Sequence, residues 1–255
     1  MATSTLPFVF GILGNIVSFI VFLAPLPTFF RVYKRKDTEG FQSIPYVVAL
    51  FSAMVWLYYA YLKPNGSMLL IINGFGCVIE ILYIVVYLIY APKTARVSTF
   101  KWLVLLNGVA FGAIVGFTYF LSKGKIRVTI VGWICCAFAV SVFVAPLSII
   151  RQVLRTKSVE FMPITLSFFL TLSAVMWFCY GIFIKDLYVA IPNVLGFLFG
   201  VAQMVLYLMY RSSSKPNTVP PEIKLPEVVP EVAKVGPNTQ QNDRNNTQEA
   251  NEFNV

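Results

Sequence analysis

Long apolar segments separated by short polar connections occupy most of this chain. Each segment is close to or above the roughly 20 residues that an α-helix needs to cross a hydrocarbon core of about 30 Å. The connections are too short to form a separate soluble domain, so the helices are expected to pack into one bundle. The predicted transmembrane helices are 6–30, 44–62, 68–90, 102–121, 128–150, 162–184 and 187–210.

One sequence motif occurs twice. SAMVWLYY at 52–59 returns as SAVMWFCY at 173–180, with Ser, Ala, Trp and the final Tyr in the same places. An Ala-Pro-Leu tripeptide precedes the tryptophan by the same distance in both copies, and an Asn-x-x-Gly segment follows it. The corresponding residues are Pro25 and Pro146, Trp56 and Trp177, and Asn73 and Asn193. Such self-similarity indicates a duplicated structural unit.

The repeat divides the predicted helices into three, one and three. Three crossings leave the chain on the opposite side of the membrane, and an unpaired fourth helix returns it, so that the two repeats run parallel. We therefore predict an all-α integral membrane fold with a first repeat at 6–90, a linker with the fourth helix at 91–127 and a second repeat at 128–210. Residues 211–255 are rich in Pro, Glu, Asn and Gln, and this composition predicts a disordered cytosolic tail.

The composition supports a membrane protein that is not an enzyme. Of the 255 residues, 58% are hydrophobic and 12% are charged, whereas about 25% are charged in a soluble domain. The chain has no histidine, which excludes His-based catalysis and His metal ligands. It also lacks a phosphate-binding loop and a nucleophile elbow. We expect no catalytic residue, metal site or cofactor, and we interpret the cysteines as packing residues: Cys77, Cys135, Cys136 and Cys179.

The positive charges predict the orientation. Most Lys and Arg residues near helix ends lie on one side of the membrane, in clusters that begin at Arg31, Lys93, Arg151 and Arg211. The positive-inside rule places this side in the cytosol and the amino terminus outside the cell; the loop at 123–127 has the opposite bias. We expect the plasma membrane, with the vacuolar membrane as the alternative. The net charge of +9 belongs to these flanks, so no nucleic-acid partner is expected.

Four prolines occupy matching places in the two repeats. A proline inside a helix removes a backbone hydrogen bond and bends the helix, and a membrane tolerates this where neighbouring groups or water satisfy the freed carbonyl. A single such proline is most simply a harmless kink, but the duplication favours hinges. Pro45 corresponds to Pro163 only if the second copy carries a small net insertion. The four are Pro25, Pro45, Pro146 and Pro163.

The duplicated tryptophan and asparagine are candidates for a binding site. Trp56 lies about 16 Å along its helix from Pro45, at about 1.5 Å per residue, which places it near the bilayer centre. A central indole needs a partner for its N–H or a ligand for its face, and a buried amide also needs hydrogen bonds. Helix–helix contact would satisfy the amides of Asn73 and Asn193. The pairing of an amide with an indole in both repeats favours a ligand.

Glu80 is a carboxylate inside a predicted span. A buried charge there is costly and marks a functional candidate. Its counterpart in the second repeat is Gly200. Glu80 is therefore either a structural residue near the cytosolic end of its helix or a proton carrier.

Several segments resemble the SWEET sugar transporters, specifically those of plants. They are FVFGILGNIVSFIVFLAPLPTFF, KRKDTEGFQSIPY, NGFGCVIE, RTKSVEFMP and KDLYVAIPNVLG. The resemblance extends from Phe8 to about Tyr210. It implies parallel repeats and a facilitative, bidirectional sugar uniporter.

The resemblance also implies roles for individual residues. The hinge residues would be Pro25, Pro45, Pro146 and Pro163, and the sugar site would contain Trp56, Asn73, Trp177 and Asn193. Tyr59 and Asp186 would close an extracellular gate. Pocket positions that accompany disaccharide transport in plant members match Ser18, Val21, Ser52, Val142 and Ser173. Ala139 departs from that pattern, which has serine, so a hydroxyl contact is missing.

Two function classes compete with passive sugar transport. A proton-coupled carrier of the related PQ-loop type, moving a small solute such as an amino acid, would use Glu80. A seven-helix receptor is a third class, but the internal repeat and the short connections argue against it. We expect a small neutral sugar as substrate, sucrose first and hexoses second, and a homo-oligomer in the lipid bilayer.

Overall fold

The computed structural model describes residues 2–159 and 162–211. Residues 160–161 and almost all of the predicted disordered tail, 211–255, lie outside the described residues. In the described part, the chain forms only helices and their connections. The helices are α1 (Ala2–Leu23), α2 (Leu26–Arg35), α3 (Ile44–Tyr61), α4 (Ser67–Tyr90), α5 (Lys93–Leu103), the π-helix η1 (Val104–Ala110), α6 (Phe111–Leu121), α7 (Gly124–Ser141), α8 (Val144–Thr156), α9 (Ile164–Phe183) and α10 (Leu187–Tyr210).

These helices join into seven apolar spans in the described part of the chain, as predicted. The fourth span begins at Lys93 and not near residue 102, because a polar helix precedes its apolar part. The fifth extends to Thr156 because the amphipathic α8 continues beyond the apolar run. The spans are Thr5–Arg35, Ile44–Tyr61, Ser67–Tyr90, Lys93–Leu121, Gly124–Thr156, Ile164–Phe183 and Leu187–Tyr210.

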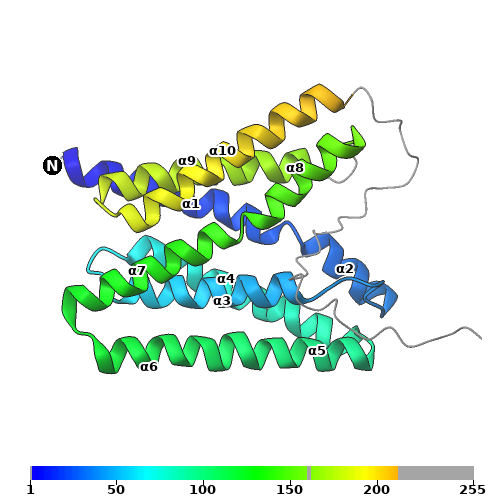
Figure 1. Cartoon of the computed structure of the whole chain (residues 1–255), viewed down its shortest axis with the longest axis horizontal. Helices are drawn as coiled ribbons and strands as arrows, with labels where there is room; N and C mark the ends of the chain where they lie inside the picture. Colours follow the sequence, from blue (N-terminus) through cyan, green and yellow to red (C-terminus); the bar gives the residue numbers. More distant parts are fainter. Residues whose placement is uncertain (1, 160–161, 212–255) are drawn as a thin grey trace, which may run out of the picture.

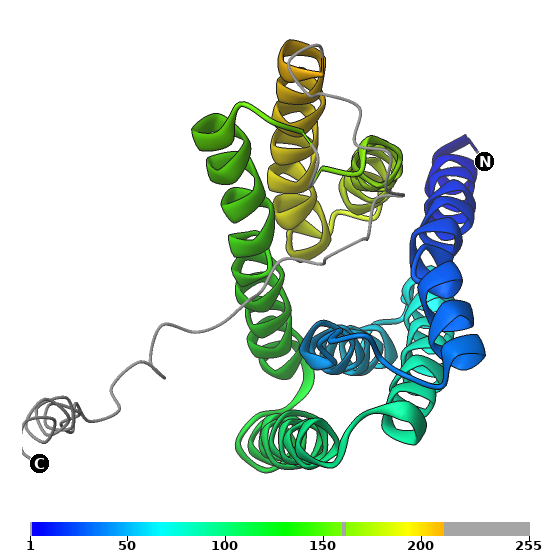
Figure 2. The ribbon, with the colours of Figure 1, turned by 90° about the vertical axis from the view of Figure 1, so that its right-hand side faces the viewer.

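The first helix of each repeat connects the two repeats. Helix α1 packs against α4 of its own repeat and also against α9 of the other. Helix α7 likewise packs against both α10 and α3. Figure 1 shows all the spans lying roughly along one direction, and Figure 2 shows the fourth span beside α3, at the edge of the bundle. The observed architecture is therefore the predicted arrangement of three, one and three helices.

Both of these first spans are broken. The first breaks at Ala24 and Pro25, and the fifth breaks at Val142 and Phe143, about one turn before Pro146. A proline at position i clashes with the carbonyl of residue i−4 and cannot donate to it, which explains a break on the N-terminal side of Pro146.

The carbonyls freed at the first break have partners. Ala24 N–H donates to the carbonyl of Val21 at 3.1 Å, which tightens the last turn of α1. The hydroxyl of Tyr83, on α4, donates to the carbonyl of Phe22 at 2.9 Å. These hydrogen bonds stabilise the break, because they satisfy backbone carbonyls that the helix no longer pairs.

The other two prolines lie at helix ends. Pro45 occupies the first turn of α3, and Pro163 is the N-cap residue of α9. A proline costs nothing there, because the missing N–H would have no partner within the helix. These two residues therefore set where the second helix of each repeat begins.

One lysine lies at the C-terminal end of each broken span. Lys36 and Lys157 end α2 and α8 in the left-handed conformation, with φ of 56° and 55°. Lys36 donates to the hydroxyl of Tyr90 at 3.0 Å, and Lys157 donates to that of Tyr210 at 2.8 Å. The hydrogen bond to Tyr90 raises the pKa of Lys36. Each contact fixes the end of a broken span on the third helix of the same repeat.

Candidate functional site

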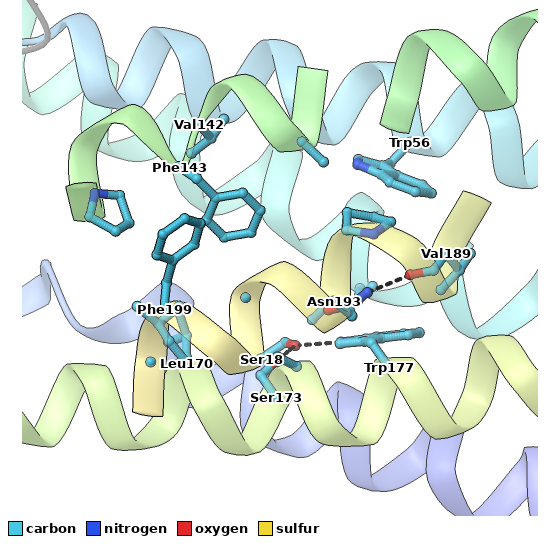
Figure 3. A pocket seen from close by; sticks show the side chains of 18 of the residues that line it. Ser18, Trp56, Val142, Phe143, Leu170, Ser173, Trp177, Val189, Asn193 and Phe199 are labelled. Atoms are coloured by element: carbon cyan, nitrogen blue, oxygen red, sulfur yellow. Dashed lines mark hydrogen bonds between the residues drawn. The ribbon is translucent and has the colours of Figure 1, made fainter. Parts of the chain in front are cut away.

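A cavity of about 420 Å³ lies between the two repeats. Helices α1, α3 and α4 line it from the first repeat, and α7 to α10 line it from the second. Its volume falls in the range of small-molecule sites, which are mostly apolar with a few placed polar groups. Figure 3 shows Trp56 and Trp177 on opposite sides of this space.

Most of the predicted binding residues line this cavity. The structure brings together Ser18, Val21, Trp56, Asn73, Val142, Ser173, Trp177 and Asn193. Ser52 is not among the lining residues in the described part of the chain. Of the four prolines, only Pro146 contributes to the wall.

Trp177 is fixed in place by two serines. Its indole N–H donates to Ser18 Oγ at 2.9 Å, and Ser18 Oγ lies 2.9 Å from Ser173 Oγ. All three side chains are buried. Gly14 lets the indole approach α1, since a Cβ at this glycine would lie 3.1 Å from the ring. Trp177 therefore forms a rigid wall of the cavity.

Trp56 is held only by packing. Its ring contacts that of Tyr59 edge to face, with centroids 5.7 Å apart. Its indole N–H has no hydrogen-bond partner among the described residues, and the ring is half-buried. Ala139 occupies the position in the second repeat that Ser18 occupies in the first. Trp56 therefore has no counterpart of the serine hydroxyl that accepts the N–H of Trp177. The N–H of Trp56 is available to a molecule in the cavity.

The two asparagines keep part of their amide groups free. Asn73 donates to the carbonyl of Leu69 at 2.8 Å, and Asn193 donates to that of Val189 at 2.7 Å. An amide has two N–H donors and one oxygen acceptor. Each side chain is therefore oriented by its own helix and retains a donor and an acceptor for a ligand. Figure 3 shows the contact of Asn193 with Val189.

A buried ionic cluster adjoins the cavity through Val189, which lines the cavity and donates its backbone N–H to Asp186. Asp186, 2% exposed, precedes α10, and the single hydroxyl of Tyr59 donates to its carboxylate, with Tyr59 Oη 2.9 and 2.8 Å from the two carboxylate oxygens. Lys63 forms a salt bridge with the same carboxylate, and the backbone N–H groups of Tyr188 and Val189 also donate to it. A buried charge needs such partners. The cluster ties α3 of the first repeat to the α9–α10 connection of the second.

Sequence reasoning missed three contributors to these sites. Lys63 lies just beyond the end of α3 and reads as a charge at a helix end, and no sequence signal pairs it with Asp186, 123 residues further along the chain. Phe143 and Phe199 also line the cavity, with ring centroids 5.2 Å apart. Phe143 repeats Phe22, since each lies three residues before the proline of the Ala-Pro-Leu tripeptide, and this repetition is a signal that could have identified it. Phe199 belongs to no repeated motif, so no sequence signal separates it from the other aromatic residues.

Glu80 lies elsewhere. Its side chain is buried in α4, and one carboxyl oxygen, Oε2, has no hydrogen-bond partner. Among the described residues, it does not line the cavity. A substrate in the cavity would therefore not contact this carboxyl group.

Comparisons with known proteins agree with this architecture. A family model described as "Sugar efflux transporter for intercellular exchange" matches the chain over residues 8–95 and again over residues 129–215. A rice protein (Oryza sativa subsp. japonica) named Bidirectional sugar transporter SWEET15 is 60% identical over 243 residues, which cover 92% of this chain and 76% of that protein. An Arabidopsis thaliana protein named Bidirectional sugar transporter SWEET10 is 54% identical over 235 residues, covering 92% of this chain and 81% of that protein. The solved structure of a eukaryotic SWEET transporter matches with a TM-score of 0.79 and 31% identity, covering 83% of this chain and 100% of that chain.

The fold and the cavity between repeats define a multi-pass membrane protein of the repeat-built transporter class. Since the family model matches most of its length and the relatives exceed half identity, the chain belongs to the SWEET family of sugar transporters. The resemblance found in the sequence is confirmed. Members of this family are transporters, so the prediction that the protein is not an enzyme is also confirmed.

Removing the hydroxyl of Tyr59 should weaken the ionic cluster. A hydrogen bond to a charged group contributes about 1.5–3 kcal/mol, and Tyr59→Phe removes the one hydroxyl that donates to the Asp186 carboxylate. We expect a lower midpoint of thermal unfolding in detergent. Tyr61→Phe is the matched control, because Tyr61 is 77% exposed. Equal midpoints for the two variants would show that the cluster does not hold the repeats together.

Proposed function

We propose that this protein carries a neutral sugar passively across a membrane in either direction, with sucrose as the main substrate and hexoses as further substrates. The observation that carries this proposal is the cavity wall. It combines two indole rings with two partly free amides, and no charged side chain is among its described lining residues. A sugar offers hydroxyl groups and flat C–H faces, which amides and aromatic rings recognise, and it carries no charge that would need a partner.

Transport would proceed by alternating access around this site. The Tyr59–Asp186–Lys63 cluster is the extracellular gate in this proposal, since most Lys and Arg residues flank the opposite ends of the spans. The amino terminus is then outside the cell and the tail at 211–255 is cytosolic. We place the protein in the plasma membrane, with the vacuolar membrane as the alternative, and as a homo-oligomer.

The broken spans supply the flexible points. Each break separates a segment that lines the cavity from a segment attached to the third helix of its repeat through Lys36 or Lys157. Bending at Pro25 and Pro146 would change the exposure of the cavity without dismantling either repeat. Pro45 and Pro163 complete the proposed hinge set at the starts of α3 and α9.

A proton-coupled carrier is the second candidate, because Glu80 is buried with an oxygen that lacks a partner. The position of Glu80 outside the cavity lining favours passive transport. The two functions differ in whether a sugar accumulates against its gradient.

Uptake in cells that lack sugar transporters tests the function. Labelled sucrose and glucose should equilibrate in both directions, without accumulation and without response to a protonophore. Asn193→Ala should abolish uptake, since an unpaired group costs roughly 1–3 kcal/mol, or about tenfold per 1.4 kcal/mol. Asn65→Ala, at an exposed loop, should not change uptake at equal surface amount. Accumulation that a protonophore removes would support the proton-coupled carrier.

Ala139→Ser should give the second repeat the hydroxyl group that Ser18 supplies in the first. The new oxygen would accept the N–H of Trp56, as Ser18 accepts that of Trp177, and would compete with the sugar. We expect KM to rise several-fold, because a hydrogen bond contributes about 0.5–1.5 kcal/mol. Ala139→Cys has a similar size but a poor acceptor and should stay near wild type. A KM for the serine variant at or below that of the cysteine variant would show that the free N–H of Trp56 does not bind substrate.

Replacing Pro25 or Pro146 with alanine tests the hinges. Alanine is favoured over proline in a helix interior by about 3 kcal/mol, comparable with the few kcal/mol that separate conformational states. Pro→Ala should therefore slow uptake while equilibrium sucrose binding is retained. Pro→Gly should keep more of the rate, because glycine is flexible. Wild-type uptake in both alanine variants, or a joint loss of binding and uptake, would contradict the hinge role.

A further inference from the structure

Gln203 is a buried amide without a protein partner. It lies on α10 with 7% of its surface exposed, and it lines the cavity. Its side chain has no hydrogen bond within the described part of the chain. The neighbouring Thr171, in contrast, donates to the carbonyl of Ser167 at 2.7 Å. The amide atoms of Gln203 are not among the fully buried polar atoms that lack a partner, so they keep accessible surface and are suited to a partner that enters the cavity.

Gln203 lies on the same face of α10 as the central site. Asn193, Gly196, Gly200 and Gln203 follow one another at helical spacing and all line the cavity. Gln203 is about 15 Å further along the helix than Asn193, at about 1.5 Å per residue. The cavity therefore has a second polar position, well separated from the tryptophan pair.

The cavity wall of the second repeat also contains apolar groups. Phe199, Leu170 and Pro146 line the cavity together with Gln203. Gly200 brings α10 close to α9, because a Cβ at this glycine would lie 2.0 Å from Thr171 Oγ1. Thr171 fills the space that a side chain at position 200 would take.

The repeat shows that this amide is not needed for the fold. The position that corresponds to Gln203 in the first repeat is Tyr83, by the same offset that relates Asn73 to Asn193. Tyr83 uses its hydroxyl to hold the carbonyl of Phe22 at the break in the first span. The first span of the second repeat is also broken, but Gln203 makes no such hydrogen bond to the backbone at that break. Its side chain therefore does not have the structural role that Tyr83 has in the first repeat.

We propose that Gln203 hydrogen-bonds the second ring of a disaccharide whose first ring lies between Trp56 and Trp177. This inference rests on the proposed function. Two linked rings extend further along α10 than one ring does, and the amide offers both a donor and an acceptor to sugar hydroxyls. Gln203 is then a specificity-determining residue that distinguishes a disaccharide from a monosaccharide.

Gln203→Met tests this role, because methionine keeps the length of the side chain and removes the amide. Initial rates of labelled sucrose and glucose uptake are measured over a concentration series, at equal surface amount. We expect the sucrose KM to rise several-fold, up to about tenfold for one lost hydrogen bond, with the glucose KM unchanged. Gln152→Met, on the exposed side of α8, is the matched control and should change neither value. Gln203→Leu provides a second loss variant should the first fail to reach the surface.

The outcomes separate the two proposals. A wild-type protein that moves neither sugar overturns the proposed function. A wild-type protein that moves both sugars, with Gln203→Met or Gln203→Leu unchanged or weakened equally for sucrose and glucose, overturns only the role of Gln203. A selective loss for sucrose supports it.

Discussion

The burial of one carboxylate, Asp186, underlies the arrangement of the two repeats. A charge with 2% exposure in an apolar bundle is stable only when it is paired and hydrogen-bonded. Its partners are the hydroxyl of Tyr59 on α3, the ammonium group of Lys63 just after α3, and backbone N–H groups in the first turn of α10. Because these partners lie on both repeats, the charge can be satisfied only when the repeats meet at this end. The cavity adjoins that junction through Val189, which lines the cavity and donates its backbone N–H to Asp186.

The backbone is nearly symmetric, but the side chains at corresponding positions have different tasks. The indole N–H of Trp177 donates to Ser18. The position in the second repeat that corresponds to Ser18 is Ala139, which has no hydroxyl, and the N–H of Trp56 stays free. A duplicated scaffold can thus hold one indole rigidly and leave the other for a ligand. A sugar is itself asymmetric, so a site with two different halves is better suited to bind it in one orientation than a perfectly symmetric site.

The broken spans show how rigidity and flexibility are divided. At its N-terminal part, α1 packs closely on α9 through Gly14 and Trp177. Beyond the break, α2 is attached to α4, and Lys36 holds its end on Tyr90. The second repeat reproduces this division with Lys157 and Tyr210. The freed carbonyl of Phe22 is already bonded in the observed state, which lowers the cost of keeping the helix broken.

The sequence by itself determined the number of spans, the duplicated unit and the family, because segment length, apolarity and recurring letters are local properties that need no structure to read. It also identified the polar and aromatic centre of the cavity wall, since Trp56, Trp177 and the two asparagines lie in repeated motifs. Only the tertiary structure decided which groups meet: Ser18 with Trp177, Lys63 with Asp186, and Ser52 away from the cavity lining. Such contacts join residues far apart in the chain and depend on the rotation of each helix about its axis. For the same reason the free amide of Gln203 and the free N–H of Trp56 could be recognised only once every other buried partner was in place.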